Sequence, residues 1–254
     1  MSAALSIGIA AAAGPEVGAR VAAAAEAAGL RALCVNDTPG HDALAVLAAA
    51  AGATERLVLA TGVLPIDRRT PDDILAGAAG IPADRLMLGI GSGQLRSGAV
   101  ESVTDAATAL RARTEARVVV GALGPRMRRA GAEASDGLLL SWLTPKIAAE
   151  QARRAHERAG AAHVALYVRT AADPAATAAL DEEARRYTGY PAYAANFARL
   201  GVEAADTVIR PVALRDRIAA YRAAADEVVL RAITASGSLD EHLRFIDAVR
   251  GAVA

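Results

Sequence analysis

A glycine pair ahead of an expected helix marks the segment GALGPRM, Gly121 to Met127. Gly121 and Gly124 leave backbone N–H groups accessible, and Pro125 is typical of the first position of a helix. The N–H groups of a helix N-terminus attract a phosphate, because they lack partners within the helix and lie at the positive end of its dipole. The segment therefore indicates either a phosphate site or a tight structural turn.

A second glycine-rich segment, GIGSGQ from Gly89 to Gln94, does not have the spacing of a nucleotide fingerprint. The Rossmann motif needs its third glycine three positions after the second, and a P-loop needs Lys followed by Ser or Thr. The segment predicts a flexible turn from strand to helix. Alternatively, the backbone of this segment comes close to a ligand at Gly91 and Ser92, which glycine permits because it has no side chain.

Cysteine and histidine give little sign of further chemistry. Cys34 is the only cysteine, so an internal disulfide and a cysteine-built metal site are excluded and a reducing cytoplasm is expected. Cys34 lies in an apolar run and is expected to be a small core residue. No cluster of His, Asp and Glu has metal-ligand spacing, and we assign no chemistry to His156, His163 or His242.

Charge and hydropathy favour a small-molecule function. The chain of 254 residues has 28 basic and 28 acidic residues, so no net field would draw it to nucleic acid or to a membrane surface. No apolar stretch approaches the roughly 18 residues needed to span a bilayer. The opening MSAALSIGIAAAAGP lacks the basic first segment of a secretion signal, and we interpret it as a strand followed by a helix.

Short apolar runs alternate with longer Ala/Arg/Glu segments of helical spacing along the whole chain, which is typical of βα units. The runs do not alternate with polar residues, so both faces of each strand are expected to be buried. A single (β/α)8 barrel over residues 1–254 is predicted, with a doubly wound open sheet as the alternative. The expected strands are Leu5 to Ala10, Leu33 to Asn36, Leu57 to Val63, Leu86 to Gly91, Val118 to Gly121, Gly137 to Leu140, Val164 to Arg169 and Val228 to Ile233.

Helix starts support this register. Thr70-Pro71, Thr144-Pro145 and Asp173-Pro174 each pair an N-cap residue with a proline, and Ser238 to Glu241 indicates a capping box before the last helix. In a barrel the functional residues gather at the carboxyl ends of the strands, where the glycine-rich segments above fall.

Four loop segments together resemble the luciferase-like monooxygenases, which are barrel oxidoreductases that use a flavin or a deazaflavin. They are LATGVLPIDRRTP, RLMLGIGSG, VVVGALGPRMRRAGAEASDGLLLSWLTP and YTGYPAYAANFARLG, in the family's order and each at an expected strand end. Between Gly93 and Val118 the chain has room for little more than one helix, Glu101 to Arg113. Larger relatives carry a long insertion there, so this chain resembles a compact member of the family.

The resemblance implies a set of site residues. A non-prolyl cis peptide between Gly62 and Val63 would form a bulge behind the cofactor ring, with an ordinary glycine turn as the alternative. Asp37 lies where many members have an Asp-His pair near the reactive ring, so Asp37 and His41 are the implied catalytic residues. Because Thr38 follows Asp37 here, His41 would be the substitute proton donor, unless it is a solvated loop residue. Arg69 would anchor its loop by pairing with Asp67, Asp72 or Asp73, and Arg68 would be solvated. The implied cofactor-binding residues are Gly62, Val63, Gly91, Ser92, Gly121, Ala122, Leu123, Gly124, Pro125, Ser141 and Trp142.

Four of the eight aromatic residues lie in RRYTGYPAYAANF, namely Tyr187, Tyr190, Tyr193 and Phe197. This segment is expected to be a cofactor lid, a substrate wall or a dimer surface, or to pack as an ordinary helix face. Trp142, the only tryptophan, would contact the ring or substrate, or serve the core or an interface. A homodimer is the expected assembly.

The predicted function is hydride transfer between coenzyme F420, or FMN, and an unidentified small organic substrate. Two alternatives remain within the resemblance: an FMN-dependent monooxygenase and a flavin-binding barrel without catalysis. A phosphate-binding aldolase or isomerase barrel would need a Lys or a carboxylate pair at the strand ends, and the only lysine, Lys146, falls at a helix start instead.

Overall fold

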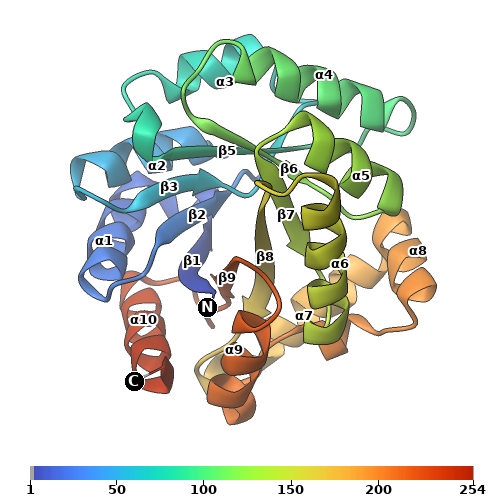
Figure 1. The fold of residues 1–254 in the computed structure, drawn as a ribbon. Coiled ribbons are helices and arrows are strands. Elements are labelled where there is room, and N and C mark those ends of the chain that lie inside the picture. Colours follow the sequence, from blue (N-terminus) through green and yellow to red (C-terminus); the bar gives the residue numbers. More distant parts are fainter. Residues whose placement is uncertain (1–2, 254) are drawn as a thin grey trace.

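A computed structural model describes residues 3–253 and shows a closed barrel of parallel strands surrounded by helices (Figure 1). The strand order is β3-β2-β1-β9-β8-β7-β6-β5-β4, and a further β3–β5 pairing closes the ring. The predicted (β/α)8 barrel is therefore confirmed and the open sheet is wrong. The strands are β1 Ala4–Ala10, β2 Ala32–Asn36, β3 Val58–Thr61, β4 Leu64–Pro65, β5 Leu86–Gly91, β6 Arg117–Gly121, β7 Gly137–Ser141, β8 His163–Thr170 and β9 Glu227–Ala232.

The short strands β3 and β4 are two parts of one barrel strand, which Gly62 and Val63 interrupt. β3 pairs with β2 and with the start of β5, whereas β4 pairs with the end of β5. The nine strands thus give the eight predicted positions around the barrel. All strand pairings are parallel, as the continuous apolar runs predict.

The helices begin largely at the predicted caps. Thr70 accepts from the N–H of Asp73 in a complete capping box, and Thr144 accepts from the N–H of Ile147. Between β8 and β9 the chain forms three α-helices, and between β5 and β6 only α4, as the predicted short insertion requires. The helices are α1 Gly14–Ala27, α2 Ala43–Gly52, α3 Pro71–Ala78, α4 Ala99–Arg111, α5 Pro125–Ala134, α6 Pro145–Arg158, α7 Thr177–Thr188, α8 Pro191–Leu200, α9 Leu214–Arg222 and α10 Leu239–Val253.

A compact cluster of eight buried side chains fills the inside of the barrel, while the larger apolar cluster lies between strands and helices. Tyr167 is the one aromatic residue of the inner cluster, and glycine makes space for it. A Cβ atom at Gly8 would lie 2.9 Å from the Tyr167 ring, and a Cβ atom at Gly62 would lie 2.5 Å from Sγ of Cys34. Cys34 is buried, as predicted. The inner cluster consists of Cys34, Ala60, Met87, Val119, Leu139, Ala165, Tyr167 and Val229.

A buried carboxylate closes the amino-terminal end of the barrel. The Glu227 side chain is fully buried; it accepts a hydrogen bond from the Ser6 hydroxyl and lies 3.1 Å from Nε of Arg31 and 2.7 Å from Nε2 of His163. Burial alone would raise the pKa of Glu227, but the contacts with His163, Ser6 and Arg31 outweigh it and hold the pKa below its usual value. This end of the barrel is therefore held by charge as well as by packing.

Within residues 3–253, no helix combines the length and the apolar character that a membrane crossing requires.

Candidate functional site

The break in the third barrel strand forms the centre of the barrel mouth. The peptide bond between Gly62 and Val63 is cis, as the resemblance implies, and the Val63 side chain lies over two glycines of neighbouring strands. A Cβ atom at Gly91 would lie 2.7 Å from Cγ2 of Val63, and one at Gly121 would lie 2.8 Å from its Cγ1. Three of the predicted loops therefore meet at Val63, and both glycines are needed for that contact.

A hydrogen-bonded chain inside the barrel holds this break in place. Asn36 donates its amide to the carbonyl oxygen of Gly62, and the Tyr167 hydroxyl donates to the amide oxygen of Asn36. Burial raises the pKa of Tyr167 and of the Cys34 thiol, so both are protonated at neutral pH. The sequence analysis did not assign a role to Asn36, although a polar residue ending a buried strand was a signal for one.

The loop from Gly121 to Gly124 leads into α5 without a side-chain cap. A Cβ atom at Gly124 would meet nothing within 4 Å, so the space in front of this position is open. By contrast, Asp42, Thr70 and Thr144 cap α2, α3 and α6 with their side chains. Ala122 is buried, Leu123 is half-buried and Pro125 is exposed. The backbone N–H groups at the start of α5 are thus suited to an external anion.

Three arginines add positive charge beside this helix start. Arg128 of α5 donates to the carbonyl oxygen of Leu123 at 2.6 Å, and among the described residues no carboxylate forms an ion pair with it. Burial first, and then the nearby charges of Arg199 and Arg154, lower the pKa of Arg128 to about 10. An anion bound here would relieve that repulsion, which makes the arrangement a fitting phosphate site.

The Asp37 carboxylate is engaged by two arginines. It lies 2.9 Å from Nη2 of Arg69 and 3.2 Å from Nη2 of Arg68, accepts from the N–H of Ala43 at 3.1 Å, and is 1% exposed. The hydrogen bonds that Arg69 donates to Asp37 are the main cause of the raised pKa of Arg69. The structure therefore places Asp37 where it joins the loops after β2 and β4.

The predicted partners of Arg69 are wrong. Besides Asp37, it pairs with Asp42 at 3.0 Å, because the loop after β2 passes beside it. The three expected carboxylates have other partners: Asp67 accepts from the N–H of Gln94, Asp72 pairs with Arg113 and Asp73 caps with Thr70. Arg68 is correspondingly not simply solvated, although its side chain is 38% exposed.

His41 lies at the exposed edge of the loop after β2. Its backbone N–H donates to the carbonyl oxygen of Thr38 at 3.0 Å. Its side chain makes no hydrogen bond or ion pair with another described residue. The side chain is therefore exposed to solvent, on the loop that follows the carboxyl end of β2.

A buried arginine connects Ser141 and Trp142 with the predicted lid. Arg169 of β8 donates to the Ser141 hydroxyl at 2.8 Å and to the Glu183 carboxylate of α7 at 3.1 Å. Its guanidinium lies 4.1 Å from the centroid of the Trp142 ring and 4.8 Å from that of Tyr187. Arg169 is 5% exposed, and the sequence analysis missed it because a strand-end arginine within an apolar run has no distinctive spacing.

The aromatic residues of α7 and α8 pack over Trp142. The Tyr187 ring lies 4.7 Å from Trp142 and 4.8 Å from Tyr193, and Phe197 contacts Trp142 edge to face at 5.8 Å. Trp142 is 2% exposed and has a positive φ of 58°. The aromatic residues of α7 and α8 therefore cover one side of the barrel mouth, and Trp142 is buried beneath them.

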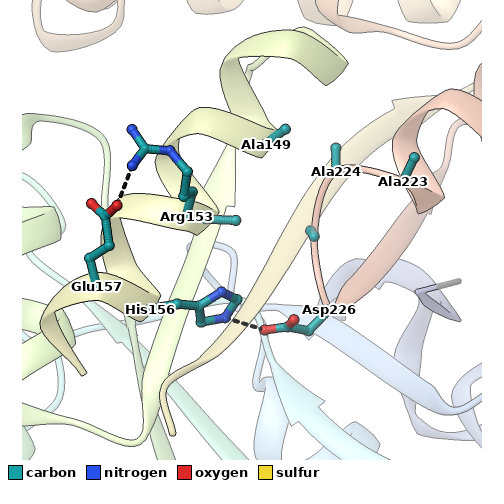
Figure 2. Close-up of a pocket in the computed structure, with 9 residues that line it drawn as sticks. Ala149, Arg153, His156, Glu157, Ala223, Ala224 and Asp226 are labelled. Carbon is teal, nitrogen blue, oxygen red and sulfur yellow. Dashed lines mark hydrogen bonds and ion pairs between the residues drawn. The ribbon is translucent and has the colours of Figure 1, made fainter. Parts of the chain in front are cut away.

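A depression at the other end of the barrel holds none of the predicted site residues. Figure 2 shows this surface of α6 and the turn before β9, where Nε2 of His156 lies 2.9 Å from Asp226 and Arg153 pairs with Glu157. Its volume is about 490 Å³ and it is wide open. Asp226 also accepts from the N–H of Val164 at 2.8 Å, so these contacts join two strand starts.

No group of three or more His, Cys, Asp or Glu side chains is arranged for metal binding within residues 3–253.

Comparison with known proteins agrees with this geometry. Residues 5–97 match the family model for luciferase-like monooxygenases. No curated protein sequence matches the chain significantly. The resemblance is thereby confirmed by sequence pattern over residues 5–97. The solved structures below share the fold over nearly the whole chain.

Three solved structures illustrate the shared fold. An F420-dependent secondary alcohol dehydrogenase in complex with an F420-acetone adduct has a TM-score of 0.71 at 15% identity, covering 98% of this chain and 99% of that one. The coenzyme F420-dependent tetrahydromethanopterin reductase of Methanopyrus kandleri has a TM-score of 0.67 at 16% identity, and the match covers 98% of each chain. The oxygenating constituent of 3,6-diketocamphane monooxygenase from Pseudomonas putida, in complex with FMN, has a TM-score of 0.64 at 14% identity. The match covers 100% of this chain and 98% of that one.

Proposed function

We propose that this protein is an oxidoreductase that binds coenzyme F420, or FMN in its place, and transfers hydride between that cofactor and a small organic substrate. The observation that carries the proposal is the uncapped start of α5, flanked by the unpaired Arg128 and adjacent to the glycine contacts of Val63. A phosphate-bearing ring cofactor needs both features side by side: an anion site and an apolar surface for the ring.

The residues present fit such a cofactor. Gly121, Gly124 and the first turn of α5 would hold its phosphate, and Val63 would support its ring, with Gly91 and Ser92 on the neighbouring loop. Ser141 and Trp142 would bound the other side of the mouth. When bound, the deazaflavin or flavin ring supplies the hydride chemistry, and FMN can in addition react with oxygen.

The chain's own residues then have three tasks. Asn36 and Tyr167 fix the backbone at Gly62, so that Val63 keeps one position in the mouth. Trp142 and the aromatic residues of α7 and α8 exclude water from one side, which strengthens electrostatic interactions within the mouth. We propose His41 as the group that delivers or removes a proton at the rim, since the Asp37 carboxylate is held by Arg68 and Arg69.

The structural neighbours include proteins described as F420-dependent and one described in complex with FMN, and both cofactors carry a phosphate and a planar ring. We favour coenzyme F420 on the resemblance of the loops. The second candidate function, cofactor binding without catalysis, is favoured by one observation: Asp37 is committed to ion pairs. Turnover of the loaded protein with an organic acceptor separates it from the first.

The test is an equilibrium titration of the purified protein with coenzyme F420 and, separately, with FMN, followed by cofactor fluorescence. A Gly124→Leu variant is the sharpest probe, because a side chain there meets only open space in the folded protein. We expect it to weaken cofactor binding about tenfold or more by covering the first turn of α5, with the melting temperature unchanged. Gly52→Leu, at the exposed end of α2, is the matched control, since it too has open space.

Riboflavin provides an internal comparison, because it has the ring of FMN without the phosphate. If the α5 start binds phosphate, wild-type protein prefers FMN to riboflavin and Gly124→Leu removes that preference. Equal binding of FMN by wild type and Gly124→Leu would contradict the phosphate site. Failure of the wild-type protein to bind either cofactor would contradict the proposed function itself.

A further inference from the structure

Arg231 is a second inward-facing arginine in the barrel mouth. Along β9, Val229 belongs to the inner cluster and Ile233 packs in the cluster of Trp142, so Arg231 between them faces the same way. It is in register with Arg169 of β8 and with Gly8 of β1, over which the Tyr167 ring packs. The charge of Arg231 also acts on the pKa of Tyr167 and of Cys34, both inside the barrel.

This guanidinium has almost no partner within the described residues. Its one hydrogen bond goes to the neighbouring carbonyl oxygen of Ala232, and it forms no ion pair with a described carboxylate. A guanidinium has five N–H donors, so most of the donors of Arg231 are available, although its side chain is half-buried. A half-buried cation without a counter-ion is unfavourable unless an anion binds to it.

The surrounding charges do not supply that anion. Arg169 and Arg231 lie at the same level of two adjacent strands, and the carboxylate that pairs with Arg169, Glu183, lies 3.1 Å from Arg169 and 4.0 Å from Arg186. The polar atoms of Asn36 and Tyr167 are used by each other and by Gly62. Glu183 is therefore already shared by two other arginines, and Arg231 has no carboxylate paired with it among the described residues.

The position of Arg231 separates it from the proposed phosphate site. The phosphate loop follows β6, whereas Arg231 is on β9, with β7 and β8 between them in the ring. An anion that contacts Arg231 is therefore a different group from one bound at the start of α5.

We propose that Arg231 selects the charge of the substrate: it binds the carboxylate, or another small anionic group, of an organic substrate in the barrel mouth. This rests on the proposed function, because it assigns the substrate class of the same mouth. Arg231 is a binding residue, which contacts the anion through its charge and its N–H donors.

The experiment uses benzoate as the probe and benzamide as its neutral isostere. Each is titrated into the complex with coenzyme F420, or with FMN if F420 does not bind, and followed by the absorbance of the bound cofactor. A second titration of the cofactor-free protein by calorimetry gives a readout independent of the cofactor. The variants are Arg231→Gln, which removes the charge, Arg231→Lys, which keeps it, and the control Arg20→Gln on the exposed surface of α1.

We expect wild type to prefer benzoate to benzamide, and Arg231→Gln to lose benzoate affinity about tenfold or more while keeping its cofactor affinity. Arg231→Lys should retain part of the preference, and Arg20→Gln all of it. The inference is overturned if Arg231→Gln binds benzoate like wild type, or if it loses cofactor affinity instead, which would assign the arginine to the cofactor.

Two further outcomes keep the inference separate from the proposed function. If wild type binds neither cofactor, the proposed function fails, but the calorimetric preference of the cofactor-free protein for benzoate still decides the role of Arg231. If Arg231→Gln does not fold, the comparison of Arg231→Lys with wild type decides it. Absence of any wild-type preference for benzoate over benzamide overturns the inference in either case.

Discussion

Arg69 binds Asp37 at two points: Nη2 lies 2.9 Å from Oδ1 and Nε lies 3.3 Å from Oδ2. The carboxylate is 1% exposed, while the arginine side chain is 19% exposed. Two parallel N–H···O contacts fix direction as well as distance, so the pair sets the position of one loop relative to the other. The loop that follows the Val63 break is thereby attached to the loop that carries His41.

Asp37→Asn should destabilise the fold, because it removes the charge that two arginines share while keeping the size of the side chain. The expected loss is about 1–3 kcal/mol, in the range for hydrogen bonds to charged groups. Urea unfolding at neutral pH measures it. The matched control is Asp72→Asn, whose ion pair with Arg113 is between side chains 79% and 50% exposed; it should cost less than about 1 kcal/mol. Equal losses in the two variants would contradict a structural role for Asp37.

Glu227 makes stability depend on acid pH in a predictable direction. Its folded pKa is held below the ordinary value of 4.5, so ionised Glu227 stabilises the fold above that value. This contribution is lost as pH falls from about 4.5 through the lower folded pKa. Glu227→Gln should be less stable at neutral pH by about 3 kcal/mol, because Arg31 and His163 lose their buried partner.

Urea unfolding of wild type and Glu227→Gln between pH 7 and pH 3 tests this. The difference in free energy of unfolding should be constant at neutral pH and should shrink towards the acid end, where the wild-type carboxylate is protonated. Other carboxylates titrate in both proteins, so only the difference is informative. A difference that does not change with pH would contradict the lowered pKa.

The fold was predictable because its signals are local. Each buried strand is a continuous apolar run between turns, and Thr70 and Thr144 cap their helices as their sequence contexts indicate. The interruption at Gly62 was also visible, since a glycine within an apolar run marks a break. That the peptide bond between Gly62 and Val63 is cis was predicted only from the family resemblance.

The partners of the charged loop residues were not predictable. Arg69 has Asp67, Asp72 and Asp73 close in sequence, yet it pairs with Asp37 and Asp42, because the barrel brings consecutive βα loops side by side. The spacing of residues along the chain does not show which loops the barrel places next to each other. The same holds for Arg169, whose partners Ser141 and Glu183 come from the preceding strand and the following helix.

Arg169 should hold α7 and α8 against the barrel. Arg169→Met keeps most of the apolar stem but removes the contacts with Ser141, Glu183 and the Trp142 ring. We expect faster amide hydrogen exchange over residues 177–200 and a red shift of the fluorescence of Trp142, the only tryptophan.

Arg186→Met is the control for this variant, because that side chain is 57% exposed and its guanidinium lies 5.8 Å from the Tyr187 ring centroid. It should change neither readout appreciably. If Arg169→Met leaves exchange and emission as in wild type, aromatic packing alone holds the two helices.

His41 offers the cleanest separation of chemistry from folding. Its exposed side chain makes no hydrogen bond or ion pair with another described residue, so His41→Ala should change the free energy of unfolding by less than about 0.5 kcal/mol. If His41 moves the proton that accompanies hydride transfer, reduction of a quinone acceptor by the cofactor-loaded enzyme should slow about tenfold or more, with cofactor affinity unchanged. His156→Ala, at the opposite end of the barrel, should leave the rate unaltered. Full turnover in His41→Ala would mean that solvent supplies the proton directly, as the open position of the side chain allows.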